Sequence, residues 1–173
     1  MTSAAVTKLP DPDETLVSRE QFTQLFRAVP SAVSIVAIAE EAGIHATTVS
    51  AFTSLSVEPP MVMLALDRRS SLLTLLSEGT QFTMNVLSHD QAEHALACAT
   101  KGPDKLPPVH WRADGGIALL VGAAAWATCR AERILDGGDH EIVLAVIQDC
   151  SVTGESPLVY HDRGFHRLSR LSG

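Results

Sequence analysis

The run from His45 to Pro60 constrains this chain most, because it is long, rich in small hydroxylated side chains and patterned as a strand. At the two-residue period of a strand, one face carries Thr48, Ser50, Phe52, Ser54 and Ser56, and the other carries Thr47, Val49, Ala51, Thr53 and Leu55. Such a strand packs one face on a core and opens its backbone to a planar, polar-edged ligand. The alternative is an antiparallel strand whose hydroxyl face meets only solvent.

The segment after this strand indicates an anion site. Pro59 and Pro60 end the strand because neither donates an amide, and the apolar residues 61–66 form the next strand. Residues 67–71 read Asp-Arg-Arg-Ser-Ser and precede a short helix with leucines on one face, capped by Ser70 or Ser71 and closed by Gly79. Amides at a helix start, two hydroxyls and two arginines suit a phosphate group. The alternative is a capped surface helix with solvated arginines.

An ordered set of motifs carries a resemblance to a known family. The set comprises residues 48–56, the triplet 58–60 (Glu-Pro-Pro), residues 68–74, residues 82–87 (Phe-Thr-Met-Asn-Val-Leu) and residues 138–140 (Gly-Asp-His). In this order they resemble the flavin reductases, small NAD(P)H:flavin oxidoreductases with a split-barrel FMN-binding fold. The resemblance extends roughly from Phe22 to Leu168, and it is strongest to the reductase components of two-component flavin-dependent monooxygenases.

The order of predicted elements gives the same fold class without the resemblance. A capping box at residues 18–21 begins a helix that ends at Pro30, and a second helix covers residues 90–100. Strands are predicted at residues 32–39, 44–55, 61–66, 81–87, 123–135, 141–152, 157–160 and 165–168. There is no βαβ rhythm and no GxGxxG motif. The prediction is a mainly β protein with a few helices, arranged as an antiparallel split β-barrel of the FMN-binding type.

Composition agrees with one soluble domain and excludes several classes of protein. The 173 residues are 46% hydrophobic and 19% charged, which is enough for one core, with residues 1–17 expected as a flexible N-terminal arm and 18–173 as the domain. A formal net charge of −7 with scattered basic residues argues against a nucleic-acid surface. No apolar run is long enough to span a membrane and no signal peptide is evident, so we expect no membrane association and a cytoplasmic location.

Cysteine and histidine spacing predicts neither disulfides nor a metal site. Cys98, Cys129 and Cys150 are odd in number, far apart and in apolar contexts, so we expect buried free thiols. The seven histidines form no metal-ligand spacing. No Gly-x-Ser-x-Gly motif supports acyl transfer.

His140 is the candidate catalytic residue. It follows two glycines and an aspartate at the turn of a predicted hairpin, where its ring is presented to a ligand. The alternative is a turn histidine that caps the hairpin. In the family the Gly-Asp-His position faces the flavin where the nicotinamide stacks, so the resemblance implies that His140 binds and orients NAD(P)H.

The resemblance also implies the remaining site residues. Those expected to bind the flavin cofactor are Thr48, Val49, Ser50, Ala51, Ser54, Asp67, Arg68, Ser71, Thr74 and Asn85. Tyr160 and Phe165 would border the nicotinamide pocket, with core packing as the alternative for both rings.

The function implied is NAD(P)H-dependent reduction of FMN, or of FAD, with delivery of reduced flavin to a partner monooxygenase. A homodimer is implied as well, and the apolar helix near residues 92–99 would supply its interface. The alternative is a non-reductase FMN-binding protein for electron transfer or sensing on the same barrel. The sequence leaves open FMN or FAD, NADH or NADPH, and flavin as substrate or prosthetic group. Asp104-Lys105-Leu106 stands where relatives commonly have Asp-Lys-Phe.

Overall fold

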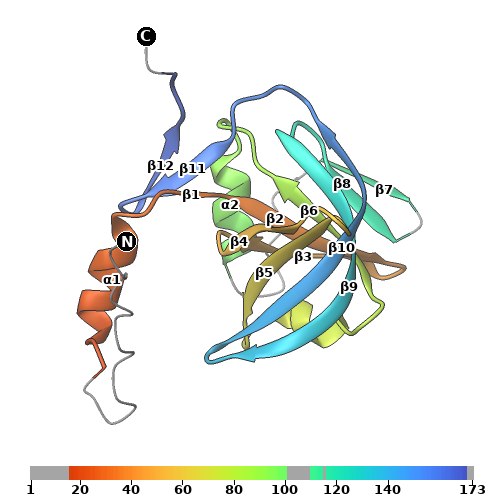
Figure 1. Cartoon of the computed structure of the whole chain (residues 1–173). Helices are drawn as coiled ribbons and strands as arrows, with labels where there is room; N and C mark the ends of the chain where they lie inside the picture. Colours follow the sequence, from red (N-terminus) through yellow and green to blue (C-terminus); the bar gives the residue numbers. More distant parts are fainter. Residues whose placement is uncertain (1–15, 101–109, 115, 171–173) are drawn as a thin grey trace, which may run out of the picture.

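The computed structural model describes residues 16–100, 110–114 and 116–170 and is built mainly from antiparallel strands (Figure 1). Its elements are α1 (Arg19–Arg27), β1 (Ser31–Ala32), β2 (Ser34–Glu40), β3 (Gly43–Val49), β4 (Phe52–Ser56), β5 (Met61–Asp67), the 3₁₀ helix η1 (Ser71–Leu75), β6 (Gln81–Val86), α2 (Ala92–Ala99), β7 (Trp111–Asp114), β8 (Ile117–Leu120), β9 (Ala125–Gly137), β10 (His140–Val152), β11 (Leu158–His161) and β12 (Gly164–Arg167). The predicted fold class is confirmed.

The main sheet has the strand order β3-β2-β6-β9-β10-β5-β4 and curls around a core (Figure 1). Its two edge strands, β3 and β4, are consecutive in the chain, which is the arrangement of a split barrel. Phe82, Leu64 and Val143 are fully buried inside it, because alternate residues of each strand point into the curl. Leu72 and Leu76 of the η1 segment close the same core, as their spacing predicts.

Helix α2 packs on a second apolar cluster with Ile35, Leu87 and Leu158. Ala95 and Cys98 of α2 are buried, and the Thr48 hydroxyl donates to the Ala95 carbonyl oxygen at 2.7 Å. Only Leu96 of this helix is a large exposed apolar residue. The barrel therefore covers most of the apolar face that was expected to form a dimer interface.

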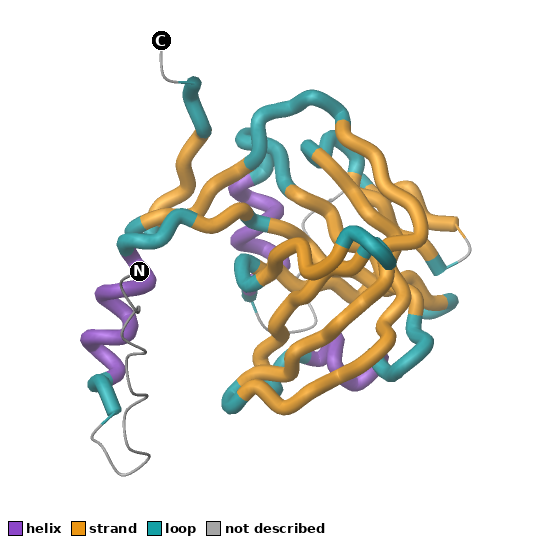
Figure 2. Tube along the Cα trace, viewed as in Figure 1, coloured by secondary structure: helices purple, strands orange, loops and turns teal. Residues whose placement is uncertain are grey.

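Helix α1 and the three-stranded sheet β1-β11-β12 extend away from the barrel as an arm (Figures 1 and 2). The predicted capping box is present, with the Ser18 and Gln21 side chains bonded to each other's backbone amides. The Asp162 amide at the β11–β12 turn donates to the Arg27 carbonyl oxygen at 3.2 Å, which ties the sheet to the end of α1. None of the residues of α1 is buried.

The long strand predicted over residues 44–55 is wrong. The chain breaks between β3 and β4 at Ser50 and Ala51, so that β3 pairs with β2 while β4 pairs with β5. The alternation changes at this bend: Val49 is buried, yet Ala51, Thr53 and Leu55 of the face expected in the core are exposed. Sequence period alone does not reveal a bend at which a strand leaves one neighbour for another.

Three smaller expectations also need correction. The leucine-rich helix is a single 3₁₀ segment, and Ser70 makes no side-chain capping bond. Strands β7 and β8 were not predicted. Cys98 and Cys129 are buried, but Cys150 is exposed. Residues 1–15 of the expected arm and the Asp104-Lys105-Leu106 loop lie outside the described residues.

Candidate functional site

Three motifs that are far apart in the sequence meet at one end of the main sheet. Strand β10 pairs with β5 so that His140 lies opposite Asp67. The Arg68 amide donates to the Asp139 carbonyl oxygen at 3.1 Å, and the Ala65 amide donates to the carbonyl oxygen of Ala51 at the β3–β4 bend, at 2.8 Å. The bend, the start of η1 and the Gly-Asp-His turn are therefore neighbours across β5.

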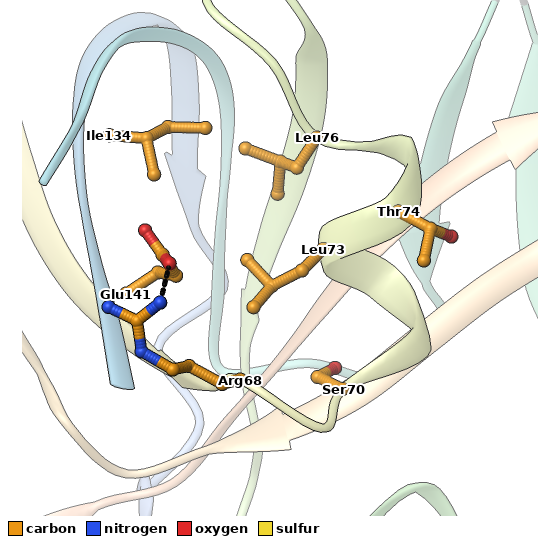
Figure 3. Close-up of a pocket in the computed structure, with 7 residues that line it drawn as sticks. All are labelled: Arg68, Ser70, Leu73, Thr74, Leu76, Ile134 and Glu141. Carbon is orange, nitrogen blue, oxygen red and sulfur yellow. Dashed lines mark ion pairs between the residues drawn. The ribbon is translucent and has the colours of Figure 1, made fainter. Parts of the chain in front are cut away.

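A pocket of about 360 Å³ lies between η1 and the β9–β10 hairpin (Figure 3). Its lining combines one apolar side with one charged side, and the residues are Arg68, Ser70, Leu73, Thr74, Leu76, Ile134 and Glu141. In Figure 3 the Arg68 and Glu141 side chains face each other beside the three aliphatic side chains. Its size and mixed lining are typical of a site for part of a small organic ligand.

Arg68 contacts the whole hairpin turn. Its Nη1 lies 2.6 Å from a carboxylate oxygen of Glu141, and its Nη2 lies 2.5 Å from one of Asp136. Its Nε donates to the Gly138 carbonyl oxygen at 2.8 Å. Arg69 is also paired, with two contacts of 2.9 and 2.6 Å to the Asp67 carboxylate, and this pairing raises the pKa of Arg69. Both arginines are paired with carboxylates, although the Arg69 side chain is 78% exposed.

His140 sits at the tip of the hairpin with its side chain partly exposed. Its Nδ1 lies 2.7 Å from an Asp139 carboxylate oxygen, and this contact lowers the pKa of Asp139. When Nδ1–H donates to the carboxylate, Nε2 is the ring nitrogen left to face a ligand.

The structure explains why positions 137 and 138 of the turn are both glycine. Gly138 has a φ of +80°, a conformation that side-chain-bearing residues rarely adopt. At Gly137 an added Cβ would stand 2.9 Å from Ile142 Cγ1. The two glycines let the turn close tightly under His140.

The other predicted flavin residues fall into two groups. The first group is exposed and comprises Ser50 and Ala51 at the bend, Ser54 on β4 opposite Val62, Ser71 at the start of η1 and Thr74 in the pocket lining. The Thr74 hydroxyl donates to the Ser71 carbonyl oxygen at 2.7 Å. Val49 is buried, and the Thr48 hydroxyl is bound to α2, so these two reach a ligand only through their backbone.

Asn85 is fully buried inside the barrel wall. Its amide nitrogen donates to carbonyl oxygens of Ile35 and Ala118, both at 3.3 Å, and its Oδ1 accepts from the Leu120 amide at 2.9 Å. These bonds join β6 to the neighbouring strands β2 and β8. The structure gives Asn85 a structural place and no opening to a ligand.

Tyr160 and Phe165 lie on the arm sheet. Their rings are in edge contact, with centroids 5.4 Å apart, and Phe165 also packs on the α2 cluster. Figure 1 shows β11 and β12 well away from the tip of the β9–β10 hairpin. One chain therefore does not bring these rings to His140.

The sequence interpretation missed Asp136 and Glu141. They flank the Gly-Gly-Asp-His turn and lie directly opposite each other across the hairpin. Like charges at opposed positions of a hairpin are unfavourable without a counter-charge. This symmetric pair was a signal that an arginine from another strand belongs between them.

Among the described residues no group of His, Cys, Asp or Glu is arranged to hold a metal ion. Burial raises the pKa of Cys98 to about 11 and that of Cys129 to about 12, which keeps both as unreactive thiols. No helix in the described part of the chain has the length and apolarity to cross a membrane.

Comparison with known proteins identifies the class and then the family. A 4-hydroxyphenylacetate 3-monooxygenase reductase component of Thermus thermophilus is 34% identical over 87% of this chain and 97% of its own length. An NADH:riboflavin 5'-phosphate oxidoreductase of Streptomyces pristinaespiralis is 31% identical over 90% of this chain and 92% of its own length. The solved structure of an NADH:FAD oxidoreductase of Streptomyces globisporus, with NAD and FAD fragments, has a TM-score of 0.81 at 25% identity, covering 94% of this chain and 97% of its own.

These are reductases that act on flavins, and the curled antiparallel sheet is their fold. The family model described as "Flavin reductase like domain" matches residues 26–169. The chain belongs to this flavin reductase family, as its motifs predict.

Proposed function

We propose that this protein is an NAD(P)H-dependent flavin reductase that binds FMN or FAD and reduces it with a hydride from the nicotinamide. One observation carries the proposal: the β3–β4 bend, the η1 segment and the Gly-Asp-His turn converge at one site in a chain of the flavin reductase family. A bound flavin supplies the redox chemistry, and the protein supplies binding and orientation.

The residues present fit a flavin. Small exposed side chains at Ser50, Ala51 and Ser54 let a flat ring approach the bend, and the pocket beside η1 offers an apolar wall of Leu73 and Ile134. Ser71, Thr74 and Arg68 would face the ribityl phosphate. Thr48 and Val49 would contribute backbone contacts, and Asp67 would hold the neighbouring Arg69. A phosphate at Arg68 would share that guanidinium with Asp136 and Glu141.

His140 is proposed to bind and orient the nicotinamide. Its ring is partly exposed at the end of the sheet, and its contact with Asp139 fixes the ring. A positioned imidazole beside the flavin edge excludes water and aligns the hydride donor. Tyr160 and Phe165 join this pocket only if a second copy of the chain brings its arm to the site.

A homodimer is proposed because the apolar side chains of α1 are exposed. Phe22, Leu25, Phe26 and Val29 are all exposed, and the Phe22 and Phe26 rings pack against each other with centroids 4.7 Å apart. A nine-residue helix with no buried side chain is not stable on its own. We propose that a second copy of the chain covers the exposed apolar face of α1.

The reduced flavin is proposed to pass to a partner monooxygenase, since the Thermus thermophilus relative is named as the reductase component of a monooxygenase. An NAD(P)H-consuming enzyme works where the reductant is made, which supports a cytoplasmic location.

Steady-state oxidation of NADH and of NADPH with FMN, FAD and riboflavin tests the proposal. Turnover that depends on added flavin is the expected result. Tight, stoichiometric retention of FMN without NAD(P)H turnover would instead favour the electron-transfer or sensor alternative. Absence of both binding and turnover would contradict either function.

A further inference from the structure

The hairpin that carries His140 contains an electrostatic conflict. Asp136 and Glu141 are Cα partners across β9 and β10, so two carboxylates face each other one pair away from Gly137 and His140, the last pair before the turn. Asp139 adds a third acidic side chain within the turn. Opposed like charges destabilise a strand pair, so a cation between them stabilises the tip of this hairpin.

Arg68 is that cation, and it comes from the turn that follows β5. Its three side-chain nitrogens are divided among Asp136, Glu141 and the Gly138 carbonyl oxygen. Its backbone amide holds the Asp139 carbonyl oxygen at 3.1 Å. A planar guanidinium suits this arrangement, because it directs several donors at fixed angles, whereas an ammonium group is a point charge.

The two carboxylate contacts of Arg68 differ in solvent exposure, and the exposure indicates which contact contributes more to holding the turn. The side chain of Glu141 is 23% exposed, that of Arg68 is 41% exposed and that of Asp136 is 82% exposed. Water screens the Asp136 contact most, so the Glu141 contact contributes most to holding the turn. Glu141 directly follows His140 in the chain, and the stronger contact is thus the one nearest the imidazole.

We propose that Arg68 is a positioning residue, which locks the hairpin turn and so fixes His140 for the nicotinamide half of the reaction. This inference rests on the proposed role of His140. It gives Arg68 a function that does not depend on a flavin phosphate. A residue whose only role is to bind phosphate would leave the turn unchanged when it is removed.

The experiment is a double-mutant cycle in which kcat/KM for NADH is measured with riboflavin, which has no phosphate, and with FMN. Arg68→Ala is expected to lower kcat/KM about 10-fold or more with both flavins, because a misplaced catalytic group costs up to about 100-fold. Arg68→Lys should recover part of the loss, and Glu141→Gln should show a smaller loss of the same kind. Arg130→Ala is the matched control, since Arg130 pairs with Glu132 on β9 and does not contact the turn.

The decisive measurement is the effect of Arg68→Ala in a protein that already carries His140→Ala. If Arg68 acts through His140, its removal has little further effect there, because the two losses are not additive. A full additional loss in that background overturns the proposal, as does an Arg68→Ala defect seen with FMN and absent with riboflavin. Should Arg68→Ala fail to fold, Arg68→Lys takes its place in the cycle.

Failure of the underlying function gives a different result. If the unmodified protein oxidises no NADH with any flavin, the flavin reductase proposal fails, and if His140→Ala is as active as the unmodified protein, the role of His140 fails. The positioning proposal fails by itself when His140→Ala is impaired and Arg68→Ala adds to it in full, or when the Arg68→Ala defect is seen with FMN and absent with riboflavin.

Discussion

The hairpin end of the main sheet and the α1 arm differ in how their exposed side chains are partnered. At the hairpin end, Arg68, Arg69 and His140 each contact a carboxylate of the same chain. In the arm, the exposed apolar side chains of α1 have no partner outside the helix among the described residues. The first region is preorganised within one chain, and the proposed dimer would complete the second.

The largest expected effect tests the arm. Phe22→Asp combined with Phe26→Asp should weaken the dimer by at least about 100-fold, because two aromatic anchors of an interface are replaced by charges. Analytical ultracentrifugation at micromolar protein measures the change. Val152→Asp is the control, because Val152 is equally apolar and exposed but lies at the end of β10. An unmodified protein that sediments as a monomer would remove the dimer proposal.

The next largest effect is expected on stability, and it distinguishes a residue that holds the barrel together from one that binds the flavin. Asn85→Ala should lower the free energy of unfolding by about 2–4 kcal/mol, because it leaves the Leu120 amide and several carbonyl groups without their partner. The flavin dissociation constant should stay the same. Gln81→Ala, an exposed change on the same strand, should alter stability by less than about 0.5 kcal/mol. A large loss of flavin affinity in Asn85→Ala would show a ligand contact after all.

A smaller effect is expected at the hairpin. His140→Ala should lower kcat/KM for NAD(P)H about 10-fold to 100-fold, which corresponds to roughly 1.4–2.7 kcal/mol of transition-state stabilisation. The flavin dissociation constant should change less than this. His140 lies opposite Asp67, which is one of the predicted flavin-binding residues, so its removal can also affect flavin binding. Both kcat/KM and the flavin dissociation constant therefore have to be measured on the same preparation. Stopped-flow reduction at an unchanged rate and affinity would return His140 to a turn-capping role.

Local rules predicted most of the frame. The Ser18 capping box, the Gly137-Gly138 hairpin and the apolar strand over residues 61–66 each depend on neighbours a few residues apart, and the structure contains all three. The family motifs likewise predicted which segments meet, although residues 67 and 140 are far apart in the sequence. Those parts of the fold could be obtained without coordinates.

Contacts between distant segments could not be obtained in this way. The strand break at Ser50 depends on the pairing of β4 with β5, and no local sequence signal predicts this break. The sequence shows two arginines beside two serines, which indicates an anion site, but the carboxylates that pair with Arg68 come from another strand. The exposure of α1 follows from the direction of the arm, which its amphipathic pattern does not contain.

The smallest effect is a change in one carboxyl pKa, and it tests the hairpin contact without any ligand. The hydrogen bond from His140 is the main cause that lowers the pKa of Asp139 below its ordinary value of 3.8. A lowered pKa in the folded state means that this contact stabilises the protein above the ordinary pKa and that the contribution is lost as the pH falls through the lowered value. In His140→Ala the pKa of Asp139 should therefore rise towards 3.8, as followed by the ¹³C shift of its carboxyl carbon from low pH upward. Asp90 is the internal control, because the Ser88 hydroxyl is the main cause that lowers its pKa, and its titration should be the same in both proteins. An unchanged Asp139 titration in His140→Ala would show that the imidazole does not hold this carboxylate, and the fixed ring orientation inferred for His140 would then be wrong.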